Sequence, residues 1–243
     1  MKNRLLIFLF IVTSCASVQA KKEFSFTLYT AREYHDFEGL NSLFSSRGYN
    51  NIDKPIYPVG INVTWKYNDF VSIDLRTDFL RERVFREQIG GSIDEIEAFG
   101  GTTLLGITYL NKRFLRGIID PGIGIGFGSL QLQTPAPAFH GEPRIYFIRV
   151  PLIDSILQSP NLESKLSKRF GLIDLNLSID VLNLPVNLKG SYWSYIVLKL
   201  KLGYTFTFTS SDWRLGPLKV KNGPNVNMNY YYIRFCFGYG GRW

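Results

Sequence analysis

The last fourteen residues of the chain, Tyr230 to Trp243, alternate between two kinds of side chain. The odd positions are almost all apolar or aromatic: Tyr231, Ile233, Phe235, Phe237, Tyr239, Gly241 and Trp243. After two tyrosines, the even positions carry small or cationic residues. Because successive side chains of a strand point to opposite faces, this period of two predicts a strand with one greasy and one polar face.

The same alternation recurs in seven earlier segments. In one of them Ile61, Val63 and Trp65 interleave with Asn62 and Thr64. The predicted strands cover approximately 24–30, 61–67, 71–79, 105–109, 122–128, 175–181 and 198–208. Several are longer than the five or six residues usual in soluble sheets. Their length suits a tilted crossing of a hydrocarbon layer, which needs about nine to eleven residues per strand.

The connections between these strands alternate in length. Long ones cover approximately 31–58, 81–98, 129–169 and 209–228, and short ones 68–69, 111–114 and 184–192. Long extracellular loops and short periplasmic turns are typical of transmembrane barrels. The sequence therefore predicts an all-β fold: an eight-stranded antiparallel up-and-down transmembrane β-barrel, in which the last strand pairs with the first because an open edge is too costly in hydrocarbon.

Charged side chains lie on the polar faces of these strands. They are Lys66, Asp74, Arg76, Asp78, Asp180, Lys199, Lys201 and Arg234. The interior of an eight-stranded barrel is just wide enough for side chains to fill, so we expect a paired lumen network that plugs the barrel. The glycines at 122, 124, 126 and 128 would make room for long basic or aromatic chains. The alternative is a soluble barrel or sandwich whose polar face meets water.

The first twenty residues have the composition of a secretory signal peptide. Lys2 and Arg4 precede an apolar block over 5–12, and Val18-Gln19-Ala20 forms a small-residue cleavage site. The expected organisation is a signal peptide over 1–20 and a barrel domain over 21–243. A second interpretation is a lipoprotein signal, with acylation at Cys15. Only one other cysteine remains, so no intramolecular disulfide is possible after cleavage.

Composition excludes several classes of function. The chain has 28 basic and 20 acidic residues, with no basic run or basic helix that would favour nucleic acid. Only two histidines, His35 and His140, are available. That inventory cannot supply a zinc site of several Cys and His ligands, so we expect no metal and no cofactor.

Together, the signal peptide, the eight alternating strands and the aromatic C-terminus resemble the small outer-membrane β-barrels of Gram-negative bacteria, the OmpA/OmpX-like group. The stretches LNSLFSSRGYN and YWSYIVLKLKLGYTF are also similar to uncharacterised barrels from the Bacteroidetes. The resemblance covers the chain after residue 20 as a pattern rather than through a diagnostic motif. It implies outer-membrane localisation.

The resemblance also implies partners. Phe235, Phe237, Tyr239 and Trp243 match the assembly signal that the barrel-assembly machinery reads in this group, although Trp replaces the usual terminal Phe and the GYGG run is unusual. Periplasmic chaperones would accompany the chain before insertion. Outer-membrane lipid and lipopolysaccharide would surround it afterwards.

Catalytic chemistry has weak support in the sequence. Lipid A acyltransferases and deacylases of this architecture use a His with a Ser or Asp partner, for which His35 beside Asp36, or His140, are the candidates. Adjacent side chains diverge, so a solvated loop histidine is the favoured interpretation. A cation site at Asp94, Glu95 and Glu97 is a further alternative. The GIGIGFG run lies inside a strand and lacks the helix of a nucleotide site.

Three functional hypotheses follow. The preferred one is a non-enzymatic outer-membrane barrel whose loops have a structural, adhesive or ligand-presenting role. The second is a lipid-modifying outer-membrane enzyme, and the third is a soluble periplasmic lipid-binding barrel. Two loop segments, around 37–44 and 153–157, have helical spacing and could cap the barrel.

Overall fold

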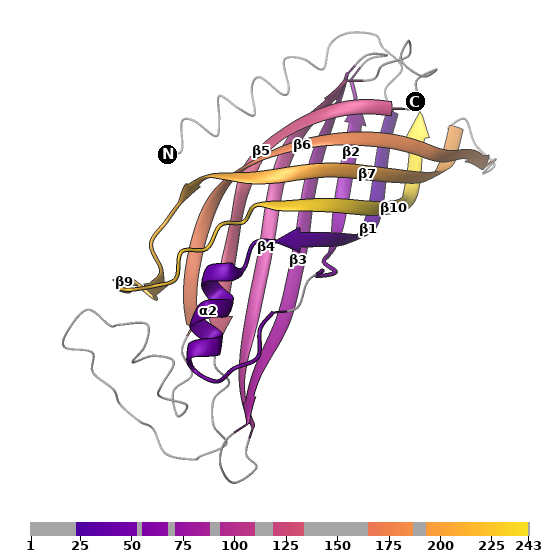
Figure 1. Ribbon diagram of the computed structural model, residues 1–243. Helices are drawn as coiled ribbons and strands as arrows, with labels where there is room; N and C mark the ends of the chain where they lie inside the picture. Colours follow the sequence, from indigo (N-terminus) through magenta and orange to yellow (C-terminus); the bar gives the residue numbers. More distant parts are fainter. Residues whose placement is uncertain are drawn as a thin grey trace.

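The computed structural model describes residues 23–52, 55–67, 71–87, 93–109, 119–133, 165–186 and 193–242. Eight antiparallel strands form a ring (Figure 1). They are β1 (Glu23–His35), β2 (Val59–Lys66), β3 (Val71–Glu87), β4 (Ile93–Tyr109), β5 (Ile119–Gln133), β6 (Lys165–Val186), β7 (Trp193–Ser210) and β10 (Tyr230–Arg242). The predicted signal peptide and its processing lie outside the described residues.

The ring closes through the first and last strands. β1 pairs antiparallel with β10 from Glu23↔Arg242 to His35↔Tyr230, and the remaining strands pair with their sequence neighbours. Each ring strand therefore has a partner on both sides for at least part of its length. The predicted eight-stranded antiparallel barrel is confirmed.

Three short elements lie at one end of the ring: α2 (Glu38–Ser46) and the two-residue strands β8 (Arg214–Leu215) and β9 (Leu218–Lys219). Leu40 and Phe44 have the i, i+4 spacing of one helix face, and both are buried. The Asp36 carboxylate accepts a hydrogen bond from the Glu38 N–H (3.2 Å) at the helix start. This helix agrees with the one expected near 37–44.

The predicted loop boundaries were wrong, because several strands continue much further. β3 runs to Glu87 and β4 begins at Ile93, so most of the long loop expected over 81–98 is paired strand. β5 and β6 likewise extend into the expected loop over 129–169, pairing Gln133 with Lys165. β6 continues to Val186, which is three residues into the turn expected over 184–192.

In these extensions the face that carries apolar side chains changes from the outside to the inside of the barrel, which hides the strand pattern in the sequence. Up to Phe79, the odd residues of β3 are the apolar outward ones; beyond it, Leu80 and Val84 point inward and are buried, while Arg81 and Arg83 point outward. We call the end of the barrel with Glu23 and Arg242 the terminal half. The loop half comprises 80–87, 93–100, 130–133 and 165–172, together with α2, β8, β9 and the segment 211–228 (Figure 1).

Candidate functional site

The interior of the terminal half gathers the eight charged residues singled out from the sequence. Asp74, Arg76, Asp78, Lys201 and Arg234 are buried, whereas Lys66, Asp180 and Lys199 are half-buried near the open end. They come from β2, β3, β6, β7 and β10, so the ring brings together residues far apart in sequence.

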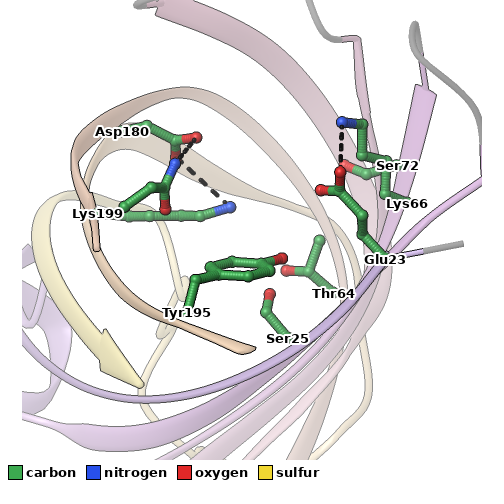
Figure 2. A pocket seen from close by; sticks show the side chains of 9 residues that line it. Glu23, Ser25, Thr64, Lys66, Ser72, Asp180, Tyr195 and Lys199 are labelled. Carbon is green, nitrogen blue, oxygen red and sulfur yellow. Dashed lines mark hydrogen bonds and ion pairs between the residues drawn. The ribbon is translucent and has the colours of Figure 1, made fainter. Parts of the chain in front are cut away.

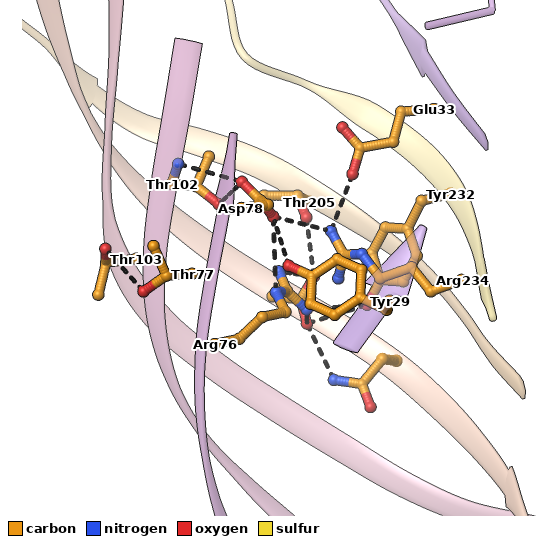
Figure 3. A network of polar contacts seen from close by, with 12 residues as sticks. Tyr29, Glu33, Arg76, Thr77, Asp78, Thr102, Thr103, Thr205, Tyr232 and Arg234 are labelled. Atoms are coloured by element: carbon orange, nitrogen blue, oxygen red, sulfur yellow. Dashed lines mark hydrogen bonds and ion pairs between the residues drawn. The ribbon is translucent and has the colours of Figure 1, made fainter. Parts of the chain in front are cut away.

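Arg76 on β3 and Asp174 on β6 form the central ion pair. The Arg76 Nη1 and Nη2 atoms donate to the two oxygens of Asp174 at 3.1 and 3.2 Å. The Thr205 hydroxyl on β7 donates to Asp174 Oδ1 at 2.7 Å (Figure 3). A bidentate pair of this kind fixes geometry as well as charge.

Arg234 on β10 links two further strands across the interior. Its guanidinium is fully buried, and Nη2 donates to Glu33 Oε1 at 3.0 Å and to Asp78 Oδ2 at 3.4 Å (Figure 3). The Arg234 Cζ atom also lies 3.6 Å from the centre of the Tyr232 ring. Buried charge is costly unless it is paired. Glu33 and Asp78 provide the opposite charge, whereas the buried Nε and Nη1 atoms of Arg234 have no hydrogen-bond partner among the described residues.

Two tyrosines complete this layer, and glycines on neighbouring strands make room for their rings. The Tyr29 hydroxyl donates to Asp78 Oδ2, and the Tyr232 hydroxyl to Asp174 Oδ2, both at 3.1 Å. A Cβ atom at Gly60 or Gly203 would lie 2.4 Å from the nearest atom of Tyr29 or Tyr232. Larger residues at either position would displace a ring.

Asp74 organises a second cluster, closer to the terminal end. Its two oxygens accept hydrogen bonds from the hydroxyls of Thr64 (2.5 Å) and Thr108 (2.6 Å), and the Lys201 Nζ lies 3.5 Å from Oδ1. One carboxylate thereby joins β2, β3, β4 and β7.

A polar cavity of about 80 Å³ lies beyond this cluster, at the terminal mouth of the barrel. Figure 2 shows two ion pairs at it: Lys66 Nζ to Glu23 Oε1 at 3.3 Å, and Lys199 Nζ to Asp180 Oδ1 at 3.5 Å. These side chains retain 14–34% exposure, so water screens both pairs.

Sequence reasoning missed several members of the network. Asp174 and Glu33 bind the two central arginines, and Tyr29 and Tyr232 hydrogen-bond to the partner carboxylates. Asp174 lies one residue before the expected start of its strand, and continuing the even-numbered polar face backwards would have found it. The glycines of β5 mostly accommodate Asn176, Asp174 and Leu172 rather than the expected long basic or aromatic chains.

His35 is not the solvated loop residue expected from the sequence. It is the last residue of β1, points inward and is buried, because β1 extends five residues further than expected. The Nε2 atom lies 2.8 Å from Glu33 Oε2, and the ring stacks against Phe37 and Tyr230. This places the imidazole inside the barrel, away from the outer surface. His140 lies outside the described residues.

The interior of the loop half is apolar instead of polar. Leu80, Ile96, Leu130 and Leu166 on four adjacent strands pack in one cluster with the buried face of α2 and with Trp213, Val220, Val226 and Met228. At the edge of this cluster, the Lys168 Nζ lies 5.8 Å from the Trp213 ring centre. Burial lowers the pKa of Lys168, and nearby Asp212 partly opposes that effect.

The outward face of the terminal half is a continuous apolar surface, and its most prominent side chains are 37–66% exposed. We call this surface the apolar belt. It includes Phe26, Leu28, Ile61, Leu75, Phe79, Ile107, Ile123, Ile125, Phe127, Leu175, Leu177, Ile233, Phe235 and Phe237. Three residues of the expected assembly signal, Phe235, Phe237 and Tyr239, lie on the outward face of β10, and Trp243 lies outside the described residues.

The acidic stretch in the second connection is part of β4. Glu95 forms an ion pair with Arg83 (3.1 Å), and Glu97 forms ion pairs with Arg81 (2.5 Å) and Arg83 (2.9 Å). The side chain of Asp94 lies outside the described part of the structure. Within the described residues, no group of three or more His, Cys, Asp or Glu could hold a metal ion. In the same part of the chain, no helix is both long and apolar enough to cross a membrane.

No protein-family model matches the sequence, and no curated protein matches it significantly. Similar solved structures include Ail, the attachment invasion locus protein of Yersinia pestis, in complex with the heparin analogue sucrose octasulfate (10% identity, 93% of this chain, 100% of that chain, TM-score 0.45). Another is the outer membrane protein OprG from Pseudomonas aeruginosa (11% identity, 92% of this chain, 96% of that chain, TM-score 0.36). A third is Neisserial surface protein A (8% identity, 90% of this chain, 95% of that chain, TM-score 0.36). At these values the likeness concerns general shape, and the strand pairing of this chain itself establishes the barrel.

Proposed function

We propose that the protein is an integral barrel of the bacterial outer membrane, without enzymatic activity, whose loop half forms a rigid extracellular surface for adhesion, ligand presentation or a structural role. The observation that carries this proposal is the apolar belt around a barrel whose charges are paired inside. In a soluble protein such a large exposed apolar surface is rare and would cause aggregation. In hydrocarbon it is the favoured outer surface.

Strand length supports the same location. Seven of the eight ring strands have 13 residues or more, which exceeds the nine to eleven or so of a tilted bilayer crossing. Both ends of the described chain, Glu23 and Arg242, lie at the end opposite to α2, as expected for insertion from the periplasm with the long loops outside.

The interior supports a plugged barrel. Arg76, Arg234 and their carboxylate partners fill the cross-section of the terminal half, and the apolar cluster fills the loop half. Planar-bilayer recordings of the reconstituted protein should show no steady conductance. A stable open channel would contradict the plugged lumen.

An apolar core beneath the loops supports a display role. α2 and the segment 211–228 are held on the extended strands by buried Leu40, Phe44, Trp213 and Met228. A surface fixed in this way presents the same side chains to any partner, which reduces the entropy cost of binding.

Biogenesis would follow the usual route for outer-membrane barrels. The sequence of residues 1–20 supports export, periplasmic chaperones would carry the chain, and the outward-facing Phe235, Phe237 and Tyr239 would be read by the barrel-assembly machinery. Phe237→Ser with Tyr239→Ser should reduce assembly into the membrane, whereas the same changes at Tyr57 and Tyr34 should not.

Location is tested by membrane fractionation combined with gel migration of unboiled and boiled samples. The protein should fractionate with outer membranes and migrate differently when it is not boiled. Recovery in the soluble periplasmic fraction would establish the soluble lipid-binding alternative instead. For the enzyme alternative, lipid A is profiled by mass spectrometry in cells with His35→Ala and His140→Ala; a profile that differs from wild type would refute the non-enzymatic proposal.

A further inference from the structure

The outer wall of the barrel carries a groove where the apolar belt meets the loop half. Its volume is about 330 Å³, and its walls include Phe79, Phe99, Gly101, Ser129, Gln131 and Lys165. Apart from Gly100, which also borders it, its lining residues hold odd-numbered, outward positions on four adjacent strands, β3 to β6. The groove is therefore separate from the polar interior described above.

The strand register arranges the groove in rows of increasing polarity. The row nearest the belt pairs Phe79 with Gly101, Gly101 with Ser129, and Ser129 with Arg169. The next row pairs Phe99 with Gln131. Small side chains at Gly101 and Ser129 form the floor, between the phenylalanine rings and the charged end.

The following row is charged. It pairs Glu97 with Gln133, and Gln133 with Lys165. Just below the floor, Phe127 on the same strand as Ser129 is 66% exposed in the apolar belt. The wall thus passes from apolar through amide to cationic over a few residues.

Cations gather at one end of the groove. Lys165 and Arg169 on β6 and Arg214 on β8 are exposed, and none of the three forms an ion pair within 4 Å of a carboxylate among the described residues, although Arg214 interacts electrostatically with Asp212. Arg214 pairs with Ser167 between them, and Lys219 lies beside Arg214 on β9. Among the described residues at this end, the acid is Asp212, whose carboxylate lies 2.7 Å from the Lys219 Nζ.

The opposite end of the groove differs in charge. Arg81 and Arg83 there are neutralised by Glu95 and Glu97. The unpaired positive charge is therefore concentrated on the side of β6 and β8. This asymmetry selects an anion at one end of the groove rather than any polar molecule along its length.

We propose that this groove binds one phosphorylated glycolipid of the outer leaflet. Its phosphate would lie against Lys165, Arg169 and Arg214, and an acyl chain would pass Phe79 into the apolar belt. The proposal rests on the outer-membrane location proposed above. Lysine and arginine form strong charge-assisted hydrogen bonds with phosphate. A soluble anion would use the cations but would gain nothing from a groove that continues into the belt.

The test measures lipid retained by the full-length barrel in nanodiscs of phosphatidylethanolamine. Native mass spectrometry counts bound bisphosphorylated lipid A, its dephosphorylated form, and soluble inositol hexakisphosphate. Wild type should retain one bisphosphorylated lipid A. Lys165→Glu and Arg169→Glu should each weaken retention by about tenfold or more. Ser129→Trp should abolish it by filling the floor while leaving every charge in place.

Arg32→Glu is the matched control, because it makes the same charge change on the outward face of β1, away from the groove. It should leave retention unchanged. Equal loss in Arg32→Glu, equal retention of the dephosphorylated lipid, or undiminished retention of bisphosphorylated lipid A by Ser129→Trp would each overturn the proposal.

Fractionation and heat-dependent migration of the same variants separate the two proposals. A barrel absent from outer membranes refutes the location itself. A barrel that inserts normally but retains no lipid refutes only the lipid site.

Discussion

Along β3 the inward side chains are Ser72, Asp74, Arg76 and Asp78 in the terminal half, but Leu80 and Val84 in the loop half. The same change occurs on β6, where inward Asp174 in the terminal half is followed towards the loops by Leu172, Phe170 and Leu166. The period of two along β3 and β6 does not change at this boundary, although the pairing of β6 with β7 shifts its register between Gly171 and Leu172. Only the choice of face for apolar residues is reversed.

The reversal shows that the surroundings, not the strand, decide which face is apolar. In the proposed outer-membrane location, the outer surface of the terminal half lies in hydrocarbon, so apolar side chains point outward and the interior must pair its charges. In the loop half the outer surface meets water, and the ordinary rule for soluble proteins returns. A single strand can follow both rules in succession.

The two halves should also differ in how they respond to mutation. An apolar core loses stability in proportion to the side-chain volume removed. A buried ionic network loses most when one partner is deleted, because the remaining charge is left uncompensated.

The largest effect is expected from Arg234→Ala. It removes the fully buried cation that binds Glu33 and Asp78 and leaves both carboxylates without it, at a cost of about 3–5 kcal/mol in the free energy of unfolding. Urea titration of the folded, heat-modifiable form in detergent measures the loss. Arg32→Ala, an outward arginine on β1, should change the free energy by less than about 1 kcal/mol. If both variants lost the same small amount of free energy of unfolding, water would have to solvate the charges inside the terminal half.

Leu40→Ala should have the next largest effect, confined to the loop half. Deleting a fully buried leucine costs about 2–5 kcal/mol, here in the docking of α2. Tryptic cleavage after Arg47, which follows the helix, should accelerate by roughly 30-fold or more while the barrel stays folded. Ser42→Ala on the exposed face of α2 is the control. If Leu40→Ala instead unfolds the barrel, the two halves are one cooperative unit.

The sequence was sufficient for the barrel and for the direction of its faces. Strands such as 71–79 and 230–243 alternate so regularly that their pairing and closure follow from period and membrane physics alone. The strand ends were not predictable by the same rule. At Leu80 and Arg81 the apolar residues move from odd to even positions. A search for apolar odd positions therefore ends the strand there, although the alternation itself continues.

The network partners could not be predicted either. Arg76 and Asp174 are 98 residues apart, and which inward side chains share a level depends on the stagger of all the strands between them. His35 was misplaced for a related reason, because the end of β1 was assigned to a loop. Glu33, which binds both His35 and Arg234, lies in the same extension.

A smaller effect on the free energy of unfolding is expected from Lys168→Met, which removes a buried cation from the apolar interior of the loop half. Burial lowers the pKa of Lys168, so between that lowered value and the ordinary 10.5 the unfolded chain binds more protons than the folded one. The free energy of unfolding of the wild type should therefore rise with pH in this range. Replacement by methionine should stabilise the protein at pH 7, and this gain should shrink by pH 10.

Unfolding midpoints at the two pH values measure this effect, with the exposed Lys219→Met as control. A loss of stability at pH 7 would show that the contacts of Lys168 with the Phe170 and Trp213 rings outweigh its desolvation.

The smallest effect is expected from Lys199→Gln, at the mouth of the terminal half. Lys199 and Asp180 retain 19% and 34% side-chain exposure, so water already solvates part of both charges. Loss of this ion pair should therefore lower the free energy of unfolding by no more than about 1 kcal/mol, and by less in high salt. Urea midpoints at low and high ionic strength measure both quantities. A loss of free energy of unfolding as large as that of Arg234→Ala, and independent of ionic strength, would contradict this expectation. It would mean that water is excluded from the ionic interior as far as Lys199.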